Sequence, residues 1–252
     1  MPIEQVKPII DSVKIEVNRL FNYTTLSKKS LEKINAKNKA EANYFLYQQN
    51  DSLLFLYLTN RTFVNYTFYY NYSDAKLISI DSTKKELNKK EGIIYEAKLA
   101  ALKEAAKAKF EIVPIPDSKI EYVFHENNTG FTLYAFTIPT IDSLITIGGD
   151  FRFIFDRKMK LVSFKKYKRA KRLSNKRIDI PSKQSGFIGS YSLYHSSKND
   201  FNNIVPDFYK FRRFYENLNI TESSSTINKR TIFINGETNE ITIELFPIEK
   251  RK

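Results

Sequence analysis

Short segments rich in β-branched and aromatic residues, separated by Asn, Asp, Ser and Gly, recur from residue 52 onward. These residue types favour strands, and the polar breaks between the segments are short enough to be turns. The pattern therefore predicts paired antiparallel strands over much of the chain. The segments are SLLFLYLT, RTFVNYTFYY, AKLISI, KIEYVFHE, FTLYAFTI, LITIGGDFRFIF and KLVSFKKY.

Turn residues indicate which of these segments form hairpins. Residues 127–130 (NNTG) are expected to join KIEYVFHE to FTLYAFTI, because Asn and Gly tolerate a positive φ. Residues 156–159 (DRKM) are expected to join LITIGGDFRFIF to KLVSFKKY, with a bulge at Gly148 and Gly149. A further strand, GSYSLYH, ends at His195, and a last hairpin turns at residues 235–236 (NG).

Helical spacing of apolar residues is found mainly before residue 110. It predicts one helix over residues 8–21 and a second that starts near Ser27 or Ser30 and runs towards Gln49. Residues 93–110 are dominated by Ala, Leu, Lys and Glu and form the strongest helix candidate, with Gly92 as a break before it.

A late helix is predicted from about Val205 to Asn217, opened by Pro206 and Asp207. The prolines of VPIPDS, Pro114 and Pro116, mark the best internal boundary. We therefore expect an α+β fold with N-terminal helices and a small antiparallel sheet in residues 1–115. Residues 116–252 are expected to form a strand-rich meander with one late helix.

The amino-acid inventory limits the chemistry that this chain can perform. It contains no cysteine and two histidines, His125 and His195, so thiol nucleophiles, disulfides and cysteine-ligated metals are excluded. No Walker-type phosphate loop and no Gly-x-Ser-x-Gly motif occurs. We therefore expect a binding protein rather than an enzyme, with no cofactor and no metal.

The N-terminal sequence and the apolar windows indicate the compartment. MPIEQVKPII has no apolar stretch followed by a small-residue cleavage site, so it does not resemble a secretory signal. The most apolar window, residues 52–72, is interrupted by Asn60, Arg61 and Asn65, which a lone membrane helix tolerates poorly. No transmembrane span is expected, and the cytoplasm is the expected location.

The positive charge of the chain is concentrated in one segment. The formal net charge is +13, and residues 157–177 hold eleven Lys and Arg and no acid, which leaves +2 for the rest. Such a local field can attract a polyanion, so non-specific nucleic-acid binding through this segment is one hypothesis. An AT-rich coding sequence also favours lysine, which is the compositional alternative. The candidate ligand-binding residues are Lys165, Lys166, Lys168, Arg169, Lys171 and Arg172.

Residues 148–151 (GGDF) resemble the GGDEF signature of diguanylate cyclases. The Glu of that signature is missing, and no upstream Asp arrangement matches a metal-phosphate site. Two glycines before a strand also make a bulge, and this structural interpretation is the alternative.

The order of residues around His195 resembles that of JAMM/MPN metalloproteases, whose pattern is His-x-His, a spacer and then Ser-x-x-Asp. His195 matches the first histidine and Asp207 the aspartate, whereas Ser197 and Ile204 replace the second histidine and the serine. The resemblance implies a hydrolase-like domain whose two remaining ligands are too few for a catalytic zinc. In the alternative interpretation, His195 ends a strand and Asp207 caps a helix.

Residues 130–245 are also similar to a group of Bacteroidota proteins that run from a Gly-x-Asp-aromatic hairpin to a strand with a histidine. This similarity implies a bacterial protein and an architecture, but no activity. Three hypotheses remain: a binding protein for a polyanion or a protein partner, a degenerate or atypical metal-dependent hydrolase, and self-association through the Tyr- and Phe-rich strands.

Overall fold

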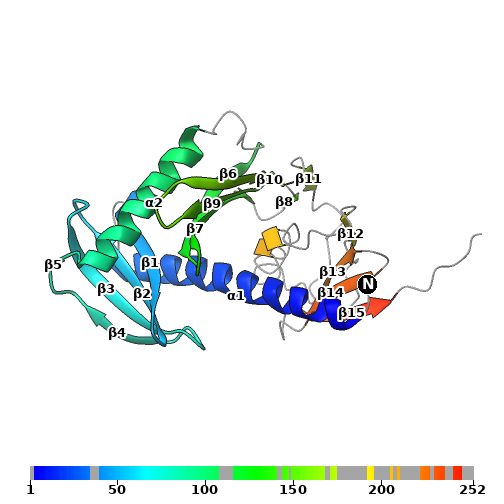
Figure 1. The fold of residues 1–252 in the computed structure, drawn as a ribbon, viewed down its shortest axis with the longest axis horizontal. Helices are drawn as coiled ribbons and strands as arrows, with labels where there is room; N and C mark the ends of the chain where they lie inside the picture. Colours follow the sequence, from blue (N-terminus) through cyan, green and yellow to red (C-terminus); the bar gives the residue numbers. More distant parts are fainter. Residues whose placement is uncertain are drawn as a thin grey trace, which may run out of the picture. The chain divides into compact units, whose positions relative to one another are not determined.

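The computed structural model divides the chain into two compact units (Figure 1). We call residues 22–137 and 149–170 the core unit, and residues 1–21, 138–148 and 171–252 the second unit. The structure describes residues 3–34, 40–107, 116–140, 144–147, 149–167, 171–174, 192–195, 205–206, 209–210, 222–227, 230–235 and 241–245.

Two four-stranded antiparallel meanders, each preceded by a helix, make up most of the core unit. Helix α1 precedes the strands β1–β4, and helix α2 precedes β6, β7, β9 and β10. The bounds are α1 Ile3–Lys33, η1 Glu41–Asn43, β1 Tyr44–Gln49, β2 Ser52–Leu58, β3 Phe63–Asn71, β4 Leu77–Asp81, β5 Lys85–Glu86, α2 Lys89–Lys107, β6 Ser118–Glu126, β7 Gly130–Pro139, β9 Phe151–Asp156 and β10 Leu161–Lys166.

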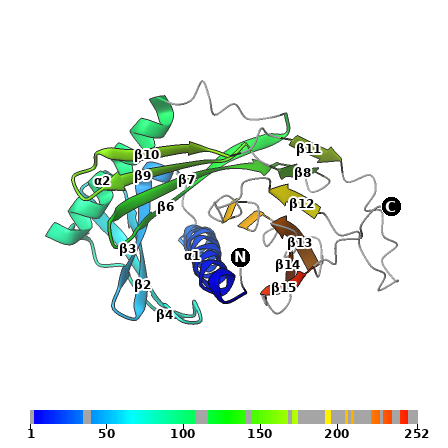
Figure 2. The ribbon, with the colours of Figure 1, turned by 45° about the vertical axis from the view of Figure 1, so that its right-hand side comes forward.

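The order of strands leaves two outer edges in the core unit. The first sheet has the order β1-β2-β3-β4, with β5 pairing β3 beyond the end of β4, and the second has the order β10-β9-β7-β6. Strands β1 and β6 lie next to each other. Among the described residues, β4 and β10 therefore each have one side without a neighbouring strand (Figure 2).

The second unit contains β8 Leu144–Ile147, β11 Lys171–Ser174, β12 Ser192–His195, β13 Glu222–Ile227, β14 Arg230–Asn235 and β15 Ile241–Leu245. Strand β8 pairs with β11, and β12 runs parallel to β13, which continues into the antiparallel strands β14 and β15. The strand pairing of the predicted last hairpin is thus confirmed, and residues 236–240, which connect the two strands, lie outside the described residues. Within the predicted late helix, Val205, Pro206, Tyr209 and Lys210 are helical, and its other residues lie outside the described part.

The prediction of two opening helices that reach Gln49 is wrong. One helix, α1, runs through residue 33, and the segment YFLYQQ is strand β1. No Gly or Pro interrupts residues 21–33, and the Ser27 hydroxyl donates to the Tyr23 carbonyl inside the helix. Residues 44–49 are extended because a two-residue turn, with Asn50 at φ 52°, pairs them with β2.

Helix α2 begins earlier than its sequence composition predicts. The Asn88 side chain accepts from the Glu91 amide at 2.9 Å, and the Glu91 carboxylate accepts from the Asn88 amide at 2.9 Å. This reciprocal capping fixes the start at Lys89, so Gly92 lies inside the first turn and is not a break. Ile94 lies on the buried face of the helix, whereas its neighbour Ile93 is exposed.

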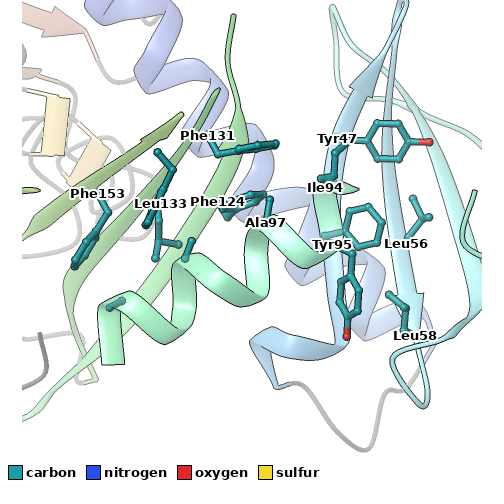
Figure 3. Packing of buried hydrophobic residues seen from close by; sticks show 14 of the residues in the cluster. Tyr47, Leu56, Leu58, Ile94, Tyr95, Ala97, Phe124, Phe131, Leu133 and Phe153 are labelled. Atoms are coloured by element: carbon teal, nitrogen blue, oxygen red, sulfur yellow. The ribbon is translucent and has the colours of Figure 1, made fainter. Parts of the chain in front are cut away.

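One hydrophobic cluster joins α2 to both meanders of the core unit (Figure 3). Leu56 and Tyr47 come from the first sheet, Phe131 and Phe153 from the second, and Ala97 from the helix between them. The small residues of α2 let its backbone approach the strands closely. The cluster therefore contains residues from both sides of the boundary predicted at residues 114–116, and residues 108–115 themselves lie outside the described part.

The C-terminal half of α1 packs on the opposite face of the two meanders. The Ser30 hydroxyl is 2.6 Å from the Tyr70 hydroxyl, and the Tyr23 ring lies edge-on to His125. Tyr70 and His125 alternate with the strand residues that face α2, so they project from the other side of the strands. The core unit is thus built as helix, sheet and helix layers, which explains why β2 and β7 are buried along nearly their whole length.

Polar side chains of α2 fix the helix on β1. The Tyr47 hydroxyl donates to the Glu91 carboxylate, the Lys98 ammonium donates to the Tyr44 carbonyl at 2.8 Å, and the Tyr95 hydroxyl donates to the Ala42 carbonyl at 2.7 Å. Burial raises the pKa values of Tyr47 and Tyr95, and the neighbouring Glu91 charge raises that of Tyr47 further. Both hydroxyls stay protonated at neutral pH and act as donors.

Replacing Gly92 by alanine is expected to stabilise the protein by about 0.5–1 kcal/mol. Glycine is a poor residue inside a helix, and a Cβ added at Gly92 meets no atom within 4 Å. The measurement is the free energy of unfolding from urea denaturation of both proteins. A destabilised variant would show that the first turn of α2 is not formed as described.

Candidate functional site

The hairpin of β9 and β10 is closed by a turn that Asp156 organises. Its carboxylate accepts from the amides of Lys158 and Lys160, each at 2.9 Å, and Met159 takes the left-handed conformation at φ 63°. This confirms the hairpin predicted at residues 156–159. The basic segment therefore starts at a tightly built turn.

Arg157, the first basic residue of the segment, makes contacts within the core unit. Its guanidinium forms an ion pair with Glu126, donates to the Asn127 carbonyl at 2.8 Å and lies over the Phe131 ring. These contacts tie the β9–β10 turn to the turn between β6 and β7. Arg157 therefore holds β10 in place.

Strand β10 exposes an apolar row on the open edge of its sheet. The exposed fractions are 38% for Leu161, 64% for Val162 and 37% for Phe164. Val162 is an extra residue in the register, because Leu161 pairs with Phe155 and Ser163 with Ile154. The bulge directs the Val162 side chain away from the sheet. We call residues 161–166 the β10 edge.

The Phe164 ring packs against aromatic side chains of β9 and is also partly exposed to solvent. Its ring lies 4.9 Å from that of Phe153 and 5.8 Å from that of Phe151. The ammonium of Lys166 lies 5.6 Å from the centre of the Phe151 ring. These ring contacts hold the Phe164 side chain against the sheet.

The candidate basic residues are distributed over the two units. Lys165 and Lys166 lie on the β10 edge and, as strand neighbours, point to opposite faces of the sheet. Lys171 and Arg172 lie on β11, which belongs to the second unit, and nothing is described of their side chains. Lys168 and Arg169 lie outside the described residues. The run of charge in the sequence is thus divided between elements of two units.

Leu161, Val162 and Phe164 are not among the site residues that the sequence predicts. The pattern of KLVSFKKY predicts a strand, but it does not show whether that strand is central or at an edge. Lysines within and beside a short strand are typical of sheet edges, and this signal was present in the sequence.

The GGDF segment has a structural role. The Asp150 carboxylate is buried and accepts from the Thr137 amide at 3.0 Å, and the Thr137 hydroxyl donates to the Gly149 carbonyl at 2.7 Å. Gly149 has φ 70°, a conformation that favours glycine. The chain leaves β7 after Pro139 and enters β9 at Phe151, so these bonds close the base of the excursion between the two strands. The predicted continuous strand with a bulge is instead two strands, β8 and β9, in different sheets.

The residues of the JAMM-like pattern fall where the structure describes little. The backbone of His195 ends β12, in register with Ile227. Ser197, Ile204 and Asp207 lie outside the described residues, as does the His195 side chain. Within the described part, no group of three or more His, Asp or Glu side chains is placed to hold a metal ion. The other histidine, His125, is buried and stacks on Tyr134.

Among the helices in the described part of the chain, none combines the length and the apolar character that crossing a membrane requires.

Comparison of the chain with protein-family models, with curated proteins and with solved structures finds no match in any of the three.

Proposed function

We propose that this protein is a binding protein that recognises an acidic, extended segment of a partner protein along the β10 edge. The observation that carries the proposal is the exposed row Leu161, Val162 and Phe164 between lysines on an open edge strand. An extended segment that adds to a sheet edge gains backbone hydrogen bonds, and its alternate side chains contact the exposed row.

The apolar row supports a protein partner. Val162 is the most exposed large apolar residue of the described chain, and it projects from a bulge at the start of the regular part of β10. Burying such side chains yields about 25 cal/mol for each Å² of apolar surface, so a partner gains most by covering them. Phosphate contacts alone would engage the lysines and leave this row in water.

The charge of the hairpin supports an acidic partner. Residues 157–166 carry five bases and no acid, and three of the bases, Lys160, Lys165 and Lys166, adjoin or form part of the edge. Lysines on an edge strand oppose pairing with another basic strand, which includes a second copy of β10. Opposite charge on the partner turns this repulsion into attraction and speeds the encounter.

The test is a fluorescence anisotropy titration of the full chain with a labelled peptide in which valine alternates with glutamate. Binding is expected to weaken at higher salt, because screening reduces the attraction between lysine and glutamate. Val162→Lys is expected to weaken binding by about tenfold or more, since it removes the central apolar contact. Ile93→Lys, on an isoleucine of α2 that is also more than half exposed, is the matched control and leaves binding unchanged.

Two further probes separate the alternatives. A peptide that alternates valine with lysine should not bind, because it meets five bases on the hairpin. Single-stranded DNA should bind more weakly than the acidic peptide and should be insensitive to Val162→Lys. Tighter binding of DNA than of the peptide would replace the proposal with the nucleic-acid hypothesis, and no peptide binding at low salt would refute it.

A further inference from the structure

The second open edge of the core unit, β4, differs in charge from the β10 edge. Its exposed apolar residues are Leu77 at 36%, Ile78 at 61% and Ile80 at 46%. Six of the eight exposed large apolar side chains in the described residues lie on β4 and β10, and the other two are Ile15 and Ile93. Between Lys76 and Asp81, the β4 edge carries no charge. We call residues 76–81, KLISID, the β4 edge.

The β4 edge lacks the charges that normally prevent two edges from pairing. Uncharged apolar edge strands associate with other strands, and proteins usually block them with lysines or with inward-pointing charges. The β10 edge has such lysines, whereas Leu77–Ile80 has none. A bulge at Ile78 is the one protective device here, and it places another isoleucine in water.

The sequence of the β4 edge is complementary to itself in the antiparallel sense. A two-fold axis between Ile78 and Ser79 brings Lys76 of one copy opposite Asp81 of the other, and the same pair forms again on the other side of the axis. It also brings Leu77 opposite Ile80.

The bulge makes this alignment consistent with one continuous sheet. Leu77 is in register with Tyr70 and Ile80 with Phe68. Tyr70 and Phe68 are two residues apart on β3, so Leu77 and Ile80 project from the same face. Residues that are directly opposite in an antiparallel pair must project from the same side of the sheet. Because of the bulge, Leu77 and Ile80 meet this condition.

Both charged residues are available for a partner. Lys76 forms an exposed ion pair with Asp74 at 3.3 Å, and exposed pairs of this kind contribute little. The Asp81 carboxylate accepts from the Thr83 amide at 2.8 Å, and this hydrogen bond lowers the pKa of Asp81, which keeps it ionised at neutral pH.

We propose that the β4 edge is a homodimer interface, in which two copies of the chain pair antiparallel through Leu77, Ile78 and Ile80 with reciprocal Lys76–Asp81 contacts. This proposal keeps the hypothesis of self-association but places the interface on β4 and not on the Tyr- and Phe-rich strands. The aromatic strand β3 is occupied by its neighbours, with Phe68 and Tyr70 buried, and the edge beside it is exposed. The interface is small, so the dimer is weak and forms with rising concentration.

Analytical ultracentrifugation of the full chain over a concentration series tests the dimer. The average mass should rise from 29.5 kDa towards twice that value. Ile78→Lys should raise the dimer dissociation constant by at least about tenfold, because each dimer loses two buried isoleucines and gains two unpaired charges. Ile78 is largely in water in the single chain, so the fold should not change.

Matched controls locate the interface. Ile93→Lys and Val162→Lys introduce the same charge at exposed apolar sites on α2 and on the β10 edge, and both should leave dimerisation unchanged. Loss of the dimer in Val162→Lys with no effect of Ile78→Lys would place self-association on β10 and overturn the proposal.

A charge exchange tests the antiparallel alignment. Lys76→Glu and Asp81→Lys should each weaken the dimer, because like charges then face each other at both ends of the interface. The double variant, Lys76→Glu with Asp81→Lys, should restore association. A double variant as weak as the single ones would exclude this alignment, and a monomeric wild-type chain at about 1 mM would exclude the dimer, since that corresponds to less than about 4 kcal/mol of binding.

Discussion

Replacing Gly130 by alanine is expected to lower the free energy of unfolding by about 3 kcal/mol, at the upper end of the cost of overpacking. Gly130 opens β7 directly opposite Asp156 of β9. A Cβ at this position would lie 2.0 Å from the Phe155 carbonyl oxygen and 2.9 Å from two backbone atoms of Asp156. Because the obstacle is backbone, the β9 strand must shift as a whole.

Urea denaturation of the Gly130→Ala and Gly92→Ala variants checks this prediction. The same substitution should have opposite signs at the two positions, since one glycine touches a neighbouring strand and the other faces open space. Peptide binding at the β10 edge should also weaken in Gly130→Ala, because β10 pairs with the displaced strand. A Gly130→Ala variant within about 0.5 kcal/mol of wild type would contradict the contact.

Replacing Asp150 by alanine is expected to cost about 3 kcal/mol, which combines the loss of a charged hydrogen bond with the burial of an amide that has lost its acceptor. Asp150 accepts from the Thr137 amide through its carboxylate and from the Tyr167 amide, at 2.8 Å, through its backbone carbonyl. The residue thus joins the end of β7, the start of β9 and the residue after β10. Alanine keeps the carbonyl bond to Tyr167, so the expected loss comes from the bond to Thr137 beside the start of β9, the strand with which β10 pairs.

The isosteric variant distinguishes the carboxylate from the space that it fills. Asp150→Asn keeps an acceptor oxygen and should cost about 1 kcal/mol, and Thr137→Val, which removes only the hydroxyl bond to Gly149, should cost a similar amount. The free energies of unfolding of the three variants are the measurement. Equal losses for Asp150→Ala and Asp150→Asn would show that the hydrogen bond to Thr137 does not contribute.

Several elements could be predicted from the sequence because their causes are local. The hairpin at residues 127–130 forms because the Asn127 side chain accepts from the amides of Thr129 and Gly130, as in an Asx turn. The reason for the glycine was different from the predicted one. Gly130 does not have a positive φ, and it is required by the approach of β9.

Other elements depend on contacts between distant segments. The sequence pattern extends the second predicted helix into YFLYQQ. The segment instead forms β1, because β2 pairs with it and α2 packs on it. Local periodicity cannot anticipate this, since burial against a distant helix decides between the two structures.

The candidate site shows the same division. Composition and local pattern alone predict the charge of residues 157–177 and the strand that carries Lys165 and Lys166. They do not indicate that Lys171 and Arg172 belong to another unit, because the strand of these two residues pairs with β8, far back in the chain.

The sequence by itself determined the strand-rich α+β character and the turns, since these follow from the conformational preferences of neighbouring residues. It also determined the concentration of positive charge in residues 157–177, which is a property of composition. Only the tertiary structure decided that β4 and β10 lie at the edges while the similar strands β2 and β7 are covered on both faces. The physical reason is that every strand carries the same backbone N–H and C=O groups along both of its sides. Which of these groups are paired depends on the spatial order of the strands in the sheet, and that order is set by segments far apart in the sequence.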